Sequence, residues 1–156
     1  MNTYLTVKWL HVLSSTILFG TGIGIAFFKW AVTRSGNVKA IRIVDERTVF
    51  ADWIFTTPAV LVQPISGAIL MYTGGYPLST GWIVLAMLLY VFAGCCWLPV
   101  VWLQLQMRTL ARIADDSGTD LPLRYRQLAR IWFWLGVPAF SSLLIIYWLM
   151  VAKPTI

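Results

Sequence analysis

Four long apolar stretches alternate with shorter polar connections along the chain. They cover about residues 4–30, 53–72, 81–105 and 131–151. Each is about 20 residues or longer, which is enough for a helix to cross the hydrocarbon core of a bilayer. None shows the alternating pattern of a barrel strand, and a span in lipid must pair its backbone groups internally, so the spans should be helical. The pattern predicts an all-α fold, a bundle of four transmembrane helices that forms a single membrane domain, residues 1–156.

The composition supports a membrane protein rather than a soluble one. Hydrophobic residues make up 59% of the chain and charged residues 12%, against about 25% charged residues in soluble domains. The formal net charge of +6 would suit a nucleic acid. However, ten of the twelve Lys and Arg residues lie between the first and second or the third and fourth apolar stretches. The lipid bilayer is therefore the expected partner, and no nucleic acid is expected.

The basic residues also predict an orientation. The two basic connections hold Lys29, Arg34, Lys39, Arg42, Arg47, Arg108, Arg112, Arg124, Arg126 and Arg130, whereas residues 73–80 carry no charge. Loops rich in Lys and Arg stay in the cytoplasm. We therefore expect a multi-pass protein of a bacterial inner (plasma) membrane, with both termini on the outer side.

Two further patterns concern the second stretch. Apolar positions in residues 37–50 recur at near-helical spacing among charges, which predicts either an interfacial turn or an extension of the second helix. Residues 53–59 (WIFTTPA) resemble residues 133–139 (FWLGVPA), 80 positions later. This similarity is either a chance match or the trace of two parallel two-helix repeats.

The only histidine, His11, lies inside the first apolar stretch. Lys8, His11 and Ser15 share one helix face. Ionisable residues within a span are costly and often mark a functional site. Imidazole ligates haem iron and titrates near neutral pH. His11 is therefore interpreted either as the ligand of a b-type haem or porphyrin, or a proton-transfer group, or as a neutral side chain hydrogen-bonded to a neighbouring helix.

The second stretch adds polar groups that could meet His11. Gln63 lies near its middle, so its amide needs an interhelical hydrogen bond or a place in a pocket lining. His11, Lys8, Ser15 and Gln63 form the predicted cofactor site, with His11 as the iron ligand. Asp52, Thr56 and Gln63 fall near one helix face, and Asp52 is expected among solvated headgroups or paired with Arg47.

Several other residues have competing interpretations. Gly20 and Gly24 form a GxxxG pair, which favours close helix packing or the approach of a flat ligand. Trp97 is expected in the core, with the lining of a cofactor pocket as the alternative. The adjacent Cys95 and Cys96 are expected to be small packing residues, with thiolate ligation of a metal as the alternative.

The whole chain resembles a bacterial family of predicted integral membrane proteins known as domain of unknown function 2269. The matching segments are Lys8-Trp9-Leu10-His11, Phe19-Gly20-Thr21-Gly22, Ala51-Asp52-Trp53, Gln63-Pro64 with Gly67, Trp97-Leu98-Pro99-Val100-Val101-Trp102, and Trp148 to Pro154. The opening is also loosely similar to HemJ-type protoporphyrinogen oxidases and CopD-like proteins. That resemblance implies that His11 contacts a porphyrin or haem. The third stretch lacks the lysine and the further histidine of the HemJ type.

The sequence leaves two functions open. One is a membrane protein that binds haem b or a porphyrin through His11. The other is a non-enzymatic transport or assembly component, in metal handling or as an accessory subunit of a respiratory complex. The sequence does not decide whether the chain is an enzyme. Either function is compatible with a membrane protein partner or with a second copy of the chain.

Overall fold

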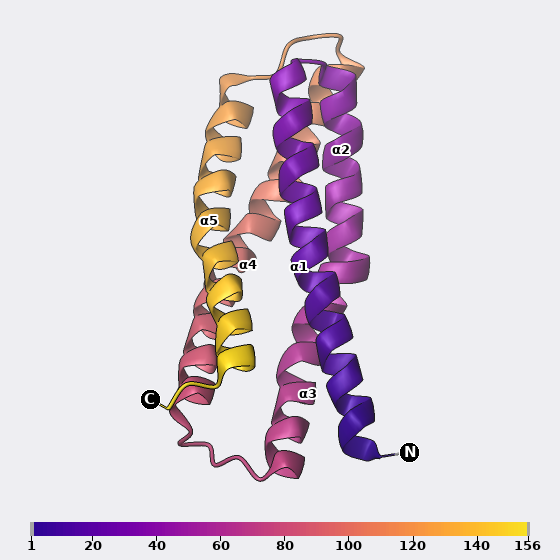
Figure 1. Cartoon of the computed structure of the whole chain (residues 1–156). Helices are drawn as coiled ribbons and strands as arrows, with labels where there is room; N and C mark the ends of the chain where they lie inside the picture. Colours follow the sequence, from indigo (N-terminus) through magenta and orange to yellow (C-terminus); the bar gives the residue numbers. More distant parts are fainter. Residues whose placement is uncertain (1, 156) are drawn as a thin grey trace.

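The computed structural model describes residues 2–155, which contain helices and no strand. The elements are α1 (Thr3–Ser35), α2 (Val38–Ala51), the π-helix η1 (Asp52–Thr56), α3 (Thr57–Gly74), α4 (Gly81–Asp116) and α5 (Leu123–Ala152). Helices α2, η1 and α3 form one continuous rod, so four rods stand side by side (Figure 1). All four are long and apolar enough to cross a membrane. The predicted all-α bundle of four transmembrane helices is confirmed.

The helices extend well beyond the predicted spans. Helix α1 continues to Ser35 and ends at Gly36, whose φ of 68° suits glycine. The Asn37 side chain then caps α2 by accepting from the Ala40 N–H at 3.0 Å. The segment 37–50 is therefore an extension of the second helix and not an interfacial turn. Lys29, which was expected in the first basic connection, lies inside α1 instead.

The bundle has two chemically different ends (Figure 1). Both termini and the uncharged turn between α3 and α4 lie at one end. The α1–α2 turn and the α4–α5 loop lie at the other, where Arg42 of α2 forms ion pairs with Asp115 and Asp116 of α4 at 2.9 and 2.6 Å. The two basic connections therefore share one side of any bilayer that the bundle spans. The assignment of that side to the cytoplasm stays a prediction.

Most of the apolar surface faces outward. Buried apolar residues form one cluster between α2, α4 and α5 (Ile41, Leu103, Met107, Ala111, Tyr125 and Leu128) and a second one at the opposite end (Trp82, Ile83, Ala86 and Leu149). Elsewhere large side chains such as Phe28, Trp53 and Trp134 are more than 60% exposed. A soluble protein would not tolerate so much exposed apolar surface, whereas lipid tails cover it in a membrane.

Two sequence patterns have no counterpart in the packing. A Cβ atom at Gly20 or Gly24 would meet nothing within 4 Å, so the pair makes no close helix contact among the described residues. Close packing against another chain, or the approach of a flat ligand, stays a prediction. Residues 53–59 span η1 and the start of α3, whereas residues 133–139 lie within the regular helix α5. The similar sequences therefore have different backbone conformations, and an internal repeat stays a prediction.

Candidate functional site

A row of polar side chains runs along one face of the α2–η1–α3 rod. Its members are Asp45, Thr48, Asp52, Thr56, Gln63 and Ser66, and we call them the polar row. Their spacing of three, four or seven positions keeps them on one helix face. Between Thr56 and Gln63 the same face carries the buried apolar residue Ala59. All except Gln63 are less than a tenth exposed. At 1.5 Å per residue the row is about 31 Å long, close to the roughly 30 Å of a hydrocarbon core.

The middle of the row is a π-helix. The Thr57 N–H donates to the carbonyl of Asp52, five residues earlier, and the Thr56 hydroxyl donates to Oδ1 of Asp52 at 2.7 Å. Pro58 follows directly after Thr57. Because proline has no N–H, it cannot donate the usual helical hydrogen bond to the carbonyl of Ile54, and this favours a local departure from regular α-helix. Short π-helical turns often occur at functional sites.

The first polar group lies toward the basic end of the bundle. Lys29 of α1 forms an ion pair with Asp45 of α2, and both side chains are at most 3% exposed. The Tyr125 hydroxyl of α5 donates to the other carboxylate oxygen at 2.9 Å. The ammonium group also lies 5.5 Å from the centroid of the Trp132 ring, within the range of a cation–π contact. Three helices therefore meet at one buried ion pair.

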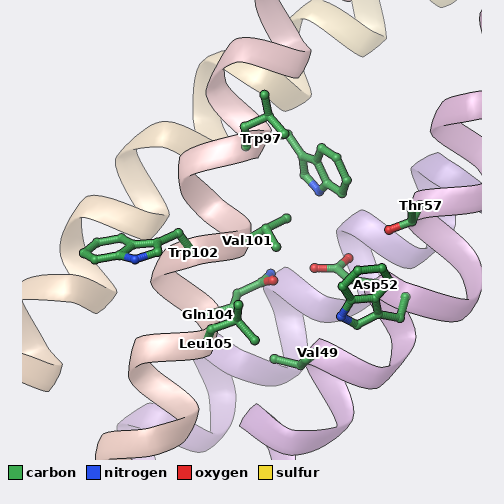
Figure 2. A pocket seen from close by; sticks show the side chains of 10 residues that line it. Val49, Asp52, Thr57, Trp97, Val101, Trp102, Gln104 and Leu105 are labelled. Carbon is green, nitrogen blue, oxygen red and sulfur yellow. The ribbon is translucent and has the colours of Figure 1, made fainter.

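The second group surrounds Asp52, halfway along the rod. Asp52 is 5% exposed and Gln104 of α4 is 4% exposed, and their side chains point toward each other (Figure 2). Oδ2 of Asp52 and Nε1 of Trp97 are buried without a hydrogen-bond partner among the described residues. Both residues line a cavity of about 300 Å³ between the rod and α4. Unsatisfied buried polar atoms are rare and call for an explanation.

The third group connects α1 with α3 toward the terminal end. Nδ1 of His11 lies 2.8 Å from Oγ of Ser66. The Gln63 amide donates to the His11 carbonyl at 2.7 Å and to the Ser14 hydroxyl at 2.6 Å. The His11 ring also lies against Gly67, where an added Cβ would be 3.5 Å from Cε1. The predicted interhelical hydrogen bond of Gln63 is confirmed.

The hydrogen bonds of Ser66 fix the tautomer of His11. The Ser66 hydroxyl lies 2.6 Å from the carbonyl of Val62, and only the hydroxyl can supply the proton of that bond. Ser66 must therefore accept from His11, so that Nδ1 carries the hydrogen. A neutral imidazole then keeps its lone pair on Nε2, and no described residue donates a hydrogen bond to that nitrogen.

The other predicted site residues lie apart from these groups. Lys8 is exposed, with its ammonium group 6.0 Å from the centroid of the Tyr4 ring. The Ser15 hydroxyl donates to the carbonyl of Val12 in its own helix at 2.8 Å. Neither contacts His11 or Gln63 through a hydrogen bond in the described part of the chain. The structure therefore brings together two of the four residues of the predicted cofactor site.

The structure corrects the interpretation of Asp52 and adds residues that the sequence did not single out. Asp52 is buried, and the ion pairs of the described residues do not join it to Arg47. The partnership of Lys29 and Asp45 was missed, although Asp45 continues the spacing of Asp52 and Thr56. Cys96 is buried and Cys95 exposed. Within residues 2–155, no three His, Cys, Asp or Glu side chains gather as a metal site would require.

Comparisons with known proteins identify a family and no activity. Residues 5–154 match the family described as "Predicted integral membrane protein (DUF2269)". No curated protein and no solved structure matches the chain. The match covers nearly the whole sequence, and the four apolar rods agree with its description. The chain therefore belongs to this family of predicted integral membrane proteins.

Proposed function

We propose that the protein is a membrane transport component that conducts protons along the polar row. The observation that carries the proposal is the length of the row, about 31 Å, which is close to the roughly 30 Å of a hydrocarbon core. Charged and titratable residues inside transmembrane bundles commonly mark ion and proton pathways. Here Asp45 and Asp52 of the row, and His11 of α1 beside Ser66, provide titratable groups at three positions along the bundle.

The chemistry of the row suits protons better than larger cations. Hydroxyl, carboxyl, imidazole and ammonium groups can each exchange a proton. A metal ion would need several ligands at one depth, whereas the ionisable groups of the row are spread along the rod. The metal-handling alternative has no support from Cys95 and Cys96, of which one is exposed and the other buried.

A purely structural role would also place polar residues between helices, because interhelical hydrogen bonds hold membrane bundles together. That role accounts for Gln63, whose amide donates to Ser14 of α1, and for Ser66, whose hydroxyl donates to the Val62 carbonyl within α3. It does not account for Asp52, because a carboxyl group that is only 5% exposed is costly to bury between helices, even with the Thr56 hydroxyl as a donor. Asp52 therefore favours a functional role for the row.

The proposal is tested with purified protein in liposomes that contain a pH-sensitive dye. After an external acid pulse, with valinomycin and potassium holding the membrane potential near zero, vesicles with protein should acidify faster than protein-free vesicles. Equal rates would refute proton conduction. A pulse of sodium chloride at constant pH serves as the control and should leave the internal pH unchanged.

The geometry of His11 supports a second candidate function, the binding of a b-type haem or porphyrin. Histidines that ligate metals usually donate their other ring N–H to a nearby oxygen, which fixes the ring and directs the free lone pair at the metal. His11 has this arrangement, with Nδ1 donating to Ser66 at 2.8 Å. Nε2 of His11 would hold the iron, and the bound haem would supply redox chemistry at that position.

Absorption spectra test this second candidate. Protein purified from haem-supplied cells should show a Soret band, and His11→Ala should remove it. Ser66→Ala should keep the band but shift it, because the ring loses the acceptor that orients it. The absence of a band in the wild-type protein, or a band unchanged in His11→Ala, would refute ligation by His11 and leave the proton proposal untouched.

A further inference from the structure

The basic end of the bundle carries a pocket between α2 and α4, with a volume of about 350 Å³. It is lined by charged groups of both signs and by two neutral residues, namely Glu46, Arg108, Thr109, Arg112, Ile113 and Asp116. The side chains of Glu46, Asp116 and Arg112 are 42, 56 and 67% exposed. A ligand can therefore reach these groups without displacing a helix.

The pocket lies where the hydrocarbon core of a bilayer would end. Glu46 adjoins Asp45, the first residue of the polar row, whose length is close to the thickness of that core. At 1.5 Å per residue, Glu46 lies about 9 Å from Asp52 toward the basic end. On α4, Arg108 and Arg112 lie about 6 and about 12 Å from the residue that faces Asp52 (Figure 2). Glu46 therefore lies at a depth between the two arginines, at the border of the headgroup layer.

The arginines of the pocket have hydrogen-bonding capacity to spare. Arg108 is half-buried, and its guanidinium group forms no ion pair with any described residue. Arg112 approaches Asp116 only to 3.7 Å, which is too long for a hydrogen bond. Two guanidinium groups four residues apart on one helix face are thus free to bind an anion.

The carboxylates of the pocket are also incompletely neutralised. The single guanidinium group of Arg42 donates to three of them, those of Glu46, Asp115 and Asp116. Glu46 accepts this one hydrogen bond at 3.2 Å, whereas a carboxylate offers about four acceptor positions. The pocket therefore offers a place for a cationic group beside the place for an anion.

We propose that this pocket binds the headgroup of phosphatidylethanolamine. The phosphate accepts hydrogen bonds from Arg108 and Arg112, because the planar guanidinium group matches the geometry of phosphate oxygens. The primary ammonium group donates to Glu46, and the acyl chains remain in the bilayer. Basic pockets between transmembrane helices are known to bind phospholipid headgroups.

The carboxylates argue against an anionic phospholipid in the same place. Phosphatidylglycerol carries the same phosphate but no positive group, so its charge would lie near Glu46 and Asp116 with nothing of its own to offset theirs. Like charges at short distance repel each other. A headgroup that carries both signs matches both kinds of group in the pocket.

The binding test compares phospholipids that have identical short acyl chains and differ only in the headgroup. Wild-type protein in detergent micelles is titrated with each lipid, and lipid-bound protein is measured by native mass spectrometry. Phosphatidylethanolamine should bind about fivefold more tightly than phosphatidylcholine, whose trimethylated ammonium group cannot donate a hydrogen bond. This factor corresponds to about 1 kcal/mol, the upper range for an exposed ion pair. Equal affinities, tighter binding of phosphatidylglycerol, or no binding of any lipid would overturn the proposal.

Variants locate the site. Arg108→Gln should weaken the binding of phosphatidylethanolamine and phosphatidylcholine alike, about fivefold. Glu46→Gln should weaken only phosphatidylethanolamine and so abolish its preference over phosphatidylcholine. Arg124→Gln changes an exposed residue of α5 outside the pocket and should alter neither affinity. A preference that persists in Glu46→Gln, or full affinity in Arg108→Gln, would overturn the assignment. The assay involves no proton movement, so its outcome is independent of proton conduction.

Discussion

Replacement of Asp45 by leucine is expected to destabilise the protein by about 3–5 kcal/mol, the usual cost of leaving one member of a buried ion pair alone. Lys29 is 2% exposed and lies too far inside α1 to regain water without disturbing the packing. The Tyr125 hydroxyl would also lose its acceptor. Unfolding in mixed detergent micelles, followed by circular dichroism, measures the loss.

The double variant Lys29→Met/Asp45→Leu separates the charge effect from packing. Removal of both charges leaves no isolated ion, so most of the lost stability should return. The control is Arg112→Met, which removes an exposed group of a longer, 3.7 Å pair with Asp116. Such surface pairs contribute little, and no change is expected. A single Asp45→Leu variant as stable as the wild type would contradict the role of this pair.

Replacement of Asp52 by asparagine is expected to lower the rate of proton uptake into liposomes to that of protein-free vesicles. Asparagine has nearly the same shape, and its Oδ1 can still accept from the Thr56 hydroxyl, so the fold should persist. The amide cannot take up and release a proton near neutral pH. A titratable group in the middle of the row would thereby be lost.

Asp120→Asn is the matched control because Asp120 lies exposed in the loop between α4 and α5. It should conduct protons at the wild-type rate. Asp52→Asn that conducts as fast as Asp120→Asn would show that the row carries no protons through Asp52. Circular dichroism and gel filtration of both variants establish that the comparison is made on folded protein.

The four spans were predictable because every helix that crosses a bilayer needs a minimum number of consecutive apolar residues. The residues at which the helices begin and end were not predictable. Ends depend on local caps, such as Gly36 in its left-handed conformation and the Asn37 side chain. Charges near the end of a span usually reach water, so Lys29 was placed in a connection. Only the packing of α1 against α2 reveals that it is buried beside Asp45.

The candidate site was predictable in part for the same reason. Helical spacing placed Asp52, Thr56 and Gln63 on one face, because that relation depends on the rod alone. The contacts across the bundle depend on how other helices pack. The hydrogen bond of His11 with Ser66, 55 residues later, and the position of Gln104 beside Asp52 required the structure. The cavity is likewise a property of two packed elements.

The central claim, proton conduction along the polar row, is tested most directly by the reversal potential of the current through the purified protein. Purified protein in a planar bilayer is placed between solutions of different pH that contain equal concentrations of sodium, potassium and chloride. Conduction along the polar row predicts a current that reverses at the equilibrium potential of protons and shifts with the pH difference. A current that reverses at zero voltage, or no current above that of the bare bilayer, would contradict the account.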